Sequence, residues 1–174
     1  MGSLLARFDL AEYRLCRRLN RGVEHAPIRV FFMAASRLGD GIIWYLLMLA
    51  LPFAYGAEGL RVALIMLASS AAGLAVYKLL KRTFVRERPF IRHAGISLAG
   101  APLDRYSFPS GHTLHAVAFT WQACAAFPEL AIVLVPLALA IAASRVVLGL
   151  HYPTDVLVGA LLGAAVGVAG TSFS

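Results

Sequence analysis

The chain has 174 residues, of which 60% are hydrophobic and only 14% are charged, and its formal net charge is +7. Soluble proteins are about 45–50% apolar and about 25% charged, so this composition excludes a soluble globular protein and predicts an integral membrane protein of one domain's length. Because apolar segments take up most of the chain, we expect the basic residues in short loops, where they face lipid head groups or an anionic substrate.

The two cysteines and the amino terminus exclude further classes. Cys16 and Cys124 have neither a metal-ligand nor a redox spacing, so we expect no disulfide and no bound metal. Charged residues stand near the amino terminus, where a signal peptide would have its apolar region, so a cleavable signal is not expected.

Residues 1–38 alternate arginines with leucines and aromatic residues at three- and four-residue intervals. This pattern predicts an amphipathic helix in the membrane interface, because the segment is too charged to span. Residues 26–38 are apolar but short and carry two arginines, so we interpret them as interfacial, with an extra span over about 24–38 as the alternative. The chain therefore divides into an interfacial segment, 1–38, and a membrane domain, 39–174.

Five apolar segments follow within the membrane domain. The predicted spans cover about residues 39–57, 60–80, 110–127, a fourth span that follows a tight turn at 128–129 and ends near 150, and 153–170. Pro153 suits the first position of the last helix, and three glycines at four-residue intervals in that helix, beginning at Gly159, predict a groove for a neighbouring helix. The expected fold class is an all-α integral membrane bundle with five spans, or six, plus an amphipathic N-terminal helix.

A dense basic patch follows the second predicted span. It consists of Lys78, Lys81, Arg82, Arg86, Arg88 and Arg92. If the five spans alternate in direction, the loop 81–109 and the junction 145–153 lie at the same membrane face, because two spans separate them. The basic patch is therefore expected to face His151.

The junction between the last two spans carries residues suited to phosphoryl transfer. Ser144 and Arg145 are followed by His151 and, four residues later, by Asp155. A neutral imidazole is a nucleophile toward phosphorus, a carboxylate can hold its other ring nitrogen, and a guanidinium binds phosphate oxygens bidentately. For this stretch alone, a local hydrogen-bonded pair at a helix start is the alternative.

Two cations of the basic patch have a helical spacing. Lys81 and Arg88 are seven residues apart, which is two helical turns, so both would project from one side if the helix extends beyond the membrane. Pro89 would then help to end that helix. The alternative is a basic flank that reaches to the lipid head groups.

The third predicted span begins with Ser110, Gly111 and His112. Serine is a good N-cap, glycine allows close approach of the backbone, and the free N–H groups of a helix start bind anions. His112 then lies where it can donate a proton to a departing alkoxide, the alternative being an interfacial histidine beside a capped helix. For His115, one turn further on, only a packing or hydrogen-bonding role is expected.

Together these residues form three motifs in a fixed order. The motifs are Lys81-x6-Arg88-Pro89, Pro109-Ser110-Gly111-His112 and Ser144-Arg145-x5-His151-x3-Asp155. They resemble the three-part signature of the type 2 phosphatidic acid phosphatase (PAP2) superfamily, which contains lipid phosphate phosphatases and vanadium haloperoxidases. Three improbable motifs in the right order are a far stronger signal than any one of them.

The resemblance implies a role for each motif residue. It implies that His151 is a nucleophile forming a phosphohistidine, that Asp155 orients it, and that His112 protonates the leaving oxygen and later activates water. The implied phosphate ligands are Lys81, Arg88, Ser110, Gly111 and Arg145. Fixed cations and helix-start amides stabilise a transferring phosphoryl group without a metal, so we expect no cofactor.

The small size and the apolar spans resemble bacterial lipid phosphate phosphatases more than the larger, soluble haloperoxidases. The implied reaction is metal-independent hydrolysis of a phosphate monoester or diphosphate on a membrane lipid: phosphatidic acid, phosphatidylglycerol phosphate or undecaprenyl diphosphate. The alternatives are a lipid A phosphatase or phosphotransferase, and a non-enzymatic small transporter or scaffold. The expected partners are the lipid substrate and membrane lipids, without nucleic acid.

Substrate selectivity and orientation are less directly encoded. Selectivity is expected from the loop 90–108, whose polar candidates are Arg92, His93, Asp104 and Arg105.

Five spans place the arginine-rich amino terminus on the catalytic face, which the positive-inside rule would make cytoplasmic. The resemblance implies instead a multi-pass protein of the bacterial inner (plasma) membrane with its site facing the periplasm, which is the orientation we expect. The glycine-lined last helix allows packing within a monomer or across a dimer.

Overall fold

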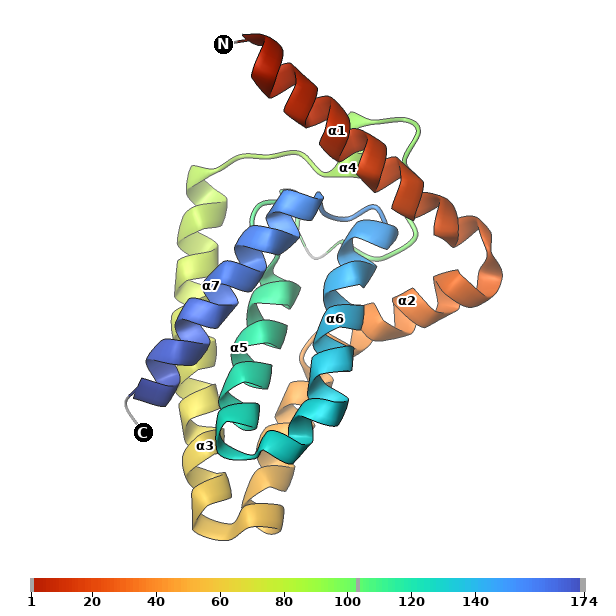
Figure 1. The fold of residues 1–174 in the computed structure, drawn as a ribbon. Helices are drawn as coiled ribbons and strands as arrows, with labels where there is room; N and C mark the ends of the chain where they lie inside the picture. Colours follow the sequence, from red (N-terminus) through yellow and green to blue (C-terminus); the bar gives the residue numbers. More distant parts are fainter. Residues whose placement is uncertain (1, 103, 173–174) are drawn as a thin grey trace.

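The computed structural model describes residues 2–102 and 104–172, which are almost entirely helical (Figure 1). Its elements, in chain order, are α1 (Gly2–Asn20), η1 (Arg21–Glu24), α2 (Ala26–Leu38), α3 (Ile42–Thr83), α4 (Pro89–Arg92), α5 (Gly111–Ala126), η2 (Pro128–Leu130), α6 (Ala131–Val147) and α7 (Pro153–Ser172). One isolated bridge, between Glu87 and Tyr106, lies in the loop before α5. The predicted all-α fold class is confirmed.

Among the described residues, three helical stretches are long and apolar enough to cross a membrane: α3, Pro128–Val147 and α7. The 42-residue α3 reverses at Gly56, whose φ of 61° and ψ of −135° suit glycine, and its two arms run side by side (Figure 1). Two spans were predicted in this region. The structure has two apolar helical arms there, and a tight reversal at Gly56 joins them in place of a loop. The total of five or six spans stays a prediction.

The 16-residue α5 lies at the centre of the bundle, between α3, α6 and α7 (Figure 1). It packs into the glycine-lined face of α7, as predicted. A Cβ added at Gly159 would lie 2.6 Å from the carbonyl oxygen of Ser110, and one at Gly163 would lie 2.4 Å from that of Leu114. Since any side chain there would push the helices apart, these glycines bring the start of α5 against the start of α7.

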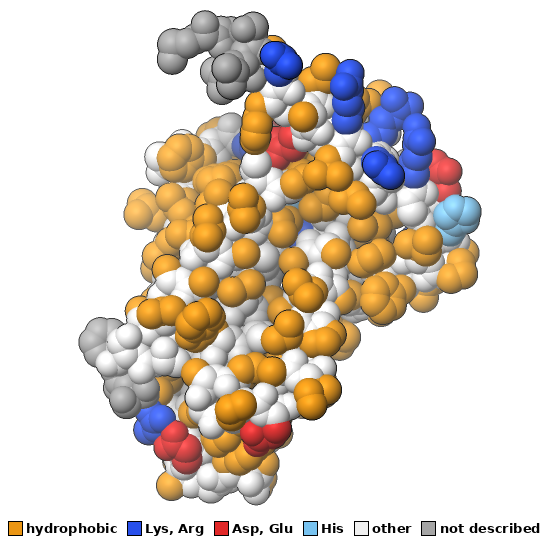
Figure 2. Space-filling view, in the orientation of Figure 1, with side chains coloured by type: hydrophobic (Ala, Val, Ile, Leu, Met, Phe, Trp, Pro, Cys, Tyr) orange, Lys and Arg blue, Asp and Glu red, His pale blue; other side chains and the backbone are white. Residues whose placement is uncertain are grey.

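Side chains on the outer surface follow a pattern suited to a bilayer. Hydrophobic side chains cover the middle of the visible face, and charged side chains gather toward its two ends (Figure 2). Many large apolar side chains are exposed, among them Phe53 at 86% and Ile132 at 82%. An apolar surface of this extent needs lipid around it, which agrees with a membrane protein.

Helix α1 lies across the end of the bundle that carries the α3–α5 and α6–α7 loops (Figure 1). It buries Glu12, Cys16 and Asn20 toward the bundle and exposes its arginines. The Asn20 amide nitrogen donates to the carbonyl oxygens of Ser97 and Val147, each at 2.9 Å. The predicted amphipathic N-terminal helix is therefore present, and it holds both loops at the predicted catalytic face.

Candidate active site

His151 lies in the loop between α6 and α7, and its side chain is almost completely buried. Gly149, with φ of 76°, allows the chain to turn after α6. The backbone N–H groups of Leu150 and His151 then both donate to the carbonyl oxygen of Arg145, at 3.0 and 2.9 Å. These hydrogen bonds fix the backbone at His151, from which the imidazole extends.

Asp155, in the first turn of α7, lies beside His151 as the spacing of the two residues predicts. Its Oδ2 is 3.8 Å from His151 Nδ1, too long for a hydrogen bond, and accepts the Tyr152 N–H at 2.8 Å. Its Oδ1 accepts from Arg86 Nη1 at 2.7 Å. A carboxylate on this side favours the proton on Nδ1 and leaves the lone pair on Nε2.

Arg88 and Lys81 meet through Asp104. Arg88 Nη1 lies 3.3 Å from His151 Nε2 and donates to the Leu150 carbonyl oxygen at 2.8 Å. Arg88 Nη2 and Lys81 Nζ contact the two carboxylate oxygens of Asp104, at 2.8 and 2.7 Å. Asp104 therefore holds the two cations of the first motif together beside the nucleophile candidate.

The predicted helical relation between the two cations is wrong. Helix α3 ends at Thr83, and Arg88 is extended, with φ of −72° and ψ of 152°, just before Pro89. A residue that precedes proline is disfavoured in helical conformation, and Pro89 here begins the short α4. The cations therefore come together through tertiary contacts and not along one helix face.

Arg145 is a second cation of the site that is as deeply buried as Arg88. It is 1% exposed, and its Nη1 donates to the Ser36 hydroxyl on α2. Its Nε makes no hydrogen bond to any residue that the structure describes. A buried donor without an acceptor is unfavourable, and a phosphate oxygen would satisfy it. Arg145 also acts electrostatically on both His112 and His151, so its charge is near both histidines.

Ser110 and Gly111 begin α5. Ser110 is the N-cap residue of α5, as predicted, but its hydroxyl is bonded to the Thr113 hydroxyl at 2.9 Å and makes no capping hydrogen bond. The Ser110 N–H donates to the Asp155 carbonyl oxygen at 3.1 Å. A Cβ at Gly111 would lie 2.9 Å from the Tyr77 ring, so only glycine allows this approach. The first-turn amides of α5 remain suited to an anion.

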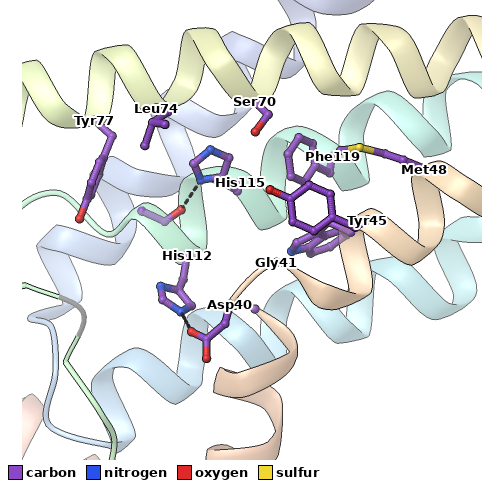
Figure 3. Close-up of a pocket in the computed structure, with 13 residues that line it drawn as sticks. Asp40, Gly41, Tyr45, Met48, Ser70, Leu74, Tyr77, His112, His115 and Phe119 are labelled. Atoms are coloured by element: carbon purple, nitrogen blue, oxygen red, sulfur yellow. Dashed lines mark hydrogen bonds and ion pairs between the residues drawn. The ribbon is translucent and has the colours of Figure 1, made fainter.

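His112 lines a cavity of about 280 Å³ between the arms of α3 and α5 (Figure 3). Its Nε2 lies 2.6 Å from Asp40 Oδ1, and it makes no hydrogen bond to His151. The remaining wall is largely apolar and includes Trp44, Met48, Leu74 and Phe119. His115 bonds the Gly111 carbonyl oxygen at 3.0 Å, as expected for a hydrogen-bonding role.

Helix α1 reaches the site through a buried carboxylate that the sequence analysis missed. Glu12 pairs with Arg86, and Arg86 in turn pairs with Asp155. Glu12 also accepts the Thr154 N–H at 3.0 Å, at the start of α7. Glu12 lies on the same helical face as Cys16, one turn away and among exposed arginines, and this position is a signal that could have pointed to it. Arg86 was noticed only as part of the basic patch.

Replacing Glu12 with glutamine is expected to lower the free energy of unfolding by about 2 kcal/mol, because Arg86 loses a buried partner. For a chain of this length that corresponds to about 5 °C in the unfolding temperature, measured in detergent. Asp9→Asn is the matched control, because Asp9 is exposed and its ion pair with Arg92 is long, at 3.9 Å. Equal unfolding temperatures for the two variants would contradict a structural role for Glu12.

Burial, together with Arg145 and Arg88, lowers the pKa of His151 from 6.5 to about 3, against the opposing effect of Asp155. Because the pKa is lowered, the imidazole stays neutral as the pH falls through 6.5 and gains a proton only near 3. We expect its ¹⁵N NMR signals in detergent, assigned with His151→Gln, to remain unchanged between pH 7 and pH 5. Titration within that range would contradict a neutral, buried imidazole.

Comparison with known proteins decides the family of this chain. The sequence profile of the PAP2 superfamily matches residues 62–174. The chain belongs to the PAP2 superfamily. The resemblance of its three motifs is thereby confirmed, as is the prediction, at the level of the family, that it is a lipid phosphate phosphatase.

Several PAP2 relatives are similar over much of the chain. Decaprenylphosphoryl-5-phosphoribose phosphatase of Mycobacterium tuberculosis is 35% identical over 134 residues, which are 76% of this chain and 72% of the relative. Lipid A 1-phosphatase of Rhizobium johnstonii is 36% identical over 90 residues, which are 49% of this chain and 37% of the relative.

Two solved structures share the fold. The crystal structure of Aquifex aeolicus LpxE has a TM-score of 0.76 and 28% identity, and the likeness covers 91% of this chain and 93% of that one. A PAP2-type phosphatidylglycerolphosphate phosphatase from Bacillus subtilis has a TM-score of 0.75 over 96% and 86% of the two chains, and at 22% identity it bears on the fold alone. At 91% and 96% of this chain, the structural likeness extends beyond residues 62–174, the region that the family profile matches.

Proposed function

We propose that this PAP2 protein hydrolyses a phosphate monoester or diphosphate on a membrane lipid, without a metal, through a phosphohistidine on His151. One observation carries the proposal. The Nε2 of a buried, neutral His151 lies 3.3 Å from a guanidinium nitrogen of Arg88, while Asp155 lies on the opposite, Nδ1 side. Nucleophile, orienting carboxylate and phosphate-binding cation are thus adjacent.

The reaction proceeds in two steps. His151 Nε2 forms a bond to phosphorus while the bond from phosphorus to the lipid oxygen breaks, and His112 gives that oxygen a proton. Water then attacks phosphorus, His112 takes its proton, and the bond to Nε2 breaks to release phosphate. Asp155 stabilises the proton on His151 Nδ1 through both steps.

The charges of the site support a phosphoryl group as the reacting unit. Lys81, Arg88 and Arg145 supply three positive charges, and α5 adds its first-turn amides. Asp104 neutralises part of this charge by contacting Lys81 and Arg88. A bound phosphate would contact Lys81 and Arg88 together with Asp104, and it would accept a hydrogen bond from Arg145 Nε.

The cavity beside His112 supports a lipid as the leaving group. His112 stands at its polar end, and the wall continues over the apolar side chains of Trp44, Met48 and Phe119 (Figure 3). A lipid whose phosphate is bound beside His151 can place its first apolar segment along this wall. The proton donor then lies where the phosphate joins the lipid.

Among lipid phosphates we rank polyprenyl-linked substrates first. The Mycobacterium tuberculosis relative, which this chain matches over 72% of the relative's length, is named for decaprenylphosphoryl-5-phosphoribose. Lipid A is the second candidate, since lipid A 1-phosphatase of Rhizobium johnstonii is 36% identical over 49% of this chain. The family assignment gives no support to the transporter or scaffold alternative.

The decisive experiment measures phosphate release by the purified protein in detergent, with a chelator present throughout. The panel contains decaprenylphosphoryl-5-phosphoribose, lipid A, phosphatidic acid, phosphatidylglycerol phosphate and undecaprenyl diphosphate. Release that survives chelation from at least one lipid is expected, and the relative rates identify the substrate. Release that requires an added metal ion, or none in detergent and in liposomes, would overturn the proposal.

We further propose that the protein lies in the bacterial inner membrane with His151 toward the periplasm. Spheroplasts that carry the protein are then expected to hydrolyse added p-nitrophenyl phosphate, which does not cross the membrane. Hydrolysis that appears only after lysis would place the site on the cytoplasmic side.

A further inference from the structure

The turn between α2 and α3 places a carboxylate against the second histidine of the site. Asp40 lies in this turn, between Gly39 and Gly41, and its Oδ1 is 2.6 Å from His112 Nε2 (Figure 3). The His112 side chain is 7% exposed and that of Asp40 is 43% exposed. A buried imidazole is thus bonded at one nitrogen to a carboxylate that keeps contact with the cavity.

The backbone holds Asp40 in this position. The Gly39 N–H donates to the Ala35 carbonyl oxygen at 3.1 Å, and the Asp40 N–H donates to that of Arg37 at 3.1 Å. A Cβ at Gly39 would lie 3.0 Å from Cδ2 of His112, so the turn itself packs against the imidazole. Gly41, with φ of 123°, then directs the chain into α3.

Asp40 also offsets the positive charge of Arg145 near His112. The Arg145 guanidinium on α6 acts electrostatically on His112, and it would repel a positive charge on the imidazole. Asp40 is the carboxylate bonded to the ring. A histidine that must gain and lose a proton beside a buried guanidinium needs such a partner to make its protonated form accessible.

We propose that Asp40 is the positioning residue of His112, holding its Nε2–H so that Nδ1 exchanges the proton with the substrate. This inference rests on the proposed function, in which His112 is the proton donor. Nδ1 makes no hydrogen bond to any described residue. Asp40 lies before residues 62–174, the region that the family profile matches.

The proton balance follows from this geometry. The imidazolium gives its Nδ1 proton to the lipid oxygen as the bond from that oxygen to phosphorus breaks, and it becomes the neutral Nε2–H tautomer. Asp40 accepts the Nε2–H bond before and after this transfer. The Nδ1 lone pair then takes a proton from the attacking water, which restores the imidazolium.

The test compares two leaving groups. A lipid alkoxide must be protonated as it leaves, whereas p-nitrophenolate leaves without a proton, so only the first needs an effective acid. We expect Asp40→Asn to slow turnover of the panel's best lipid by about 10- to 100-fold. Single-turnover release of p-nitrophenol, with enzyme in excess, is expected to change by less than about threefold. Asp40→Glu, which keeps the carboxylate, should recover part of the lipid turnover.

His112→Gln, assayed in the same way, separates this inference from the proposed function. One outcome is that His112→Gln slows the lipid more than p-nitrophenyl phosphate while Asp40→Asn leaves the ratio of the two rates as in the wild type. That result would leave the role of His112 intact but overturn the role of Asp40. An equal loss on both substrates in Asp40→Asn would also overturn it, because it would show a merely structural residue. If His112→Gln slows both substrates equally, the acid role of His112 itself fails. Should Asp40→Asn not fold, Asp40→Glu is judged by the same selectivity.

Discussion

His151→Ala is expected to abolish hydrolysis of the lipid substrate, with a loss of about 10⁴-fold or more, because it removes the proposed nucleophile. His151 is the imidazole whose Nε2 lies beside Arg88, and His112 is engaged with Asp40. Rapid acid-free quenching of the wild-type protein with ³²P-labelled substrate should trap a phosphoprotein that is labile to acid and stable to alkali. The His151→Ala protein should carry no label.

A matched control distinguishes loss of the nucleophile from loss of a histidine as such. His25 is exposed at the start of α2 and makes no side-chain hydrogen bond among the described residues. His25→Gln is expected to retain both turnover and labelling. Labelling in His151→Ala, or turnover close to that of the wild type, would rule out the phosphohistidine mechanism for this protein.

Arg88→Lys is expected to lower kcat by about 10²- to 10³-fold, the loss typical of removing one donor that stabilises a transition-state charge. The Arg88 guanidinium serves four acceptors at once: the carbonyl and carboxylate oxygens of Asp104, the Leu150 carbonyl oxygen and His151 Nε2. An ammonium has neither the planar shape nor the donors for this arrangement, so the charge is kept while the geometry is lost. Inhibition by vanadate, which resembles the transferring phosphoryl group, should weaken in parallel.

Arg92→Lys is the control for this substitution. Arg92 lies four residues further on, at the end of the short helix α4, but its side chain is 53% exposed and forms a long ion pair with Asp9, at 3.9 Å. Its replacement is expected to leave kcat within about twofold, as exposed pairs contribute little. If the two variants had the same kcat, Arg88 would not act on the transition state and positive charge alone would suffice.

Sequence spacing predicted those parts of the site that lie on one short stretch of chain. His151 and Asp155 are separated by one turn at the start of α7, so their proximity follows from local geometry once Pro153 begins the helix. A groove for a neighbouring helix on α7 was predicted from the glycines at four-residue intervals, and the structure identifies that neighbour as α5. Composition alone was enough to predict a helical membrane protein.

The spacing argument failed where the chain leaves the helix. Lys81 and Arg88 were expected on one helix face, but α3 ends at Thr83, and Asp104 joins the two cations from the far end of the following loop. A helical period describes side chains only while the backbone stays helical. Pro89 signalled this departure, because it restricts the residue before it.

The sequence by itself therefore determined that this is a helical membrane protein with two histidines, a carboxylate and three cations in the order of the PAP2 signature. The tertiary structure decided which other charges complete the site. Glu12, Asp40 and Asp104 each reach it from an element distant in sequence, through α1, the α2–α3 turn and the loop before α5. Ion pairs between distant segments have no period along the chain, because they depend on how the helices pack and where each loop crosses the end of the bundle.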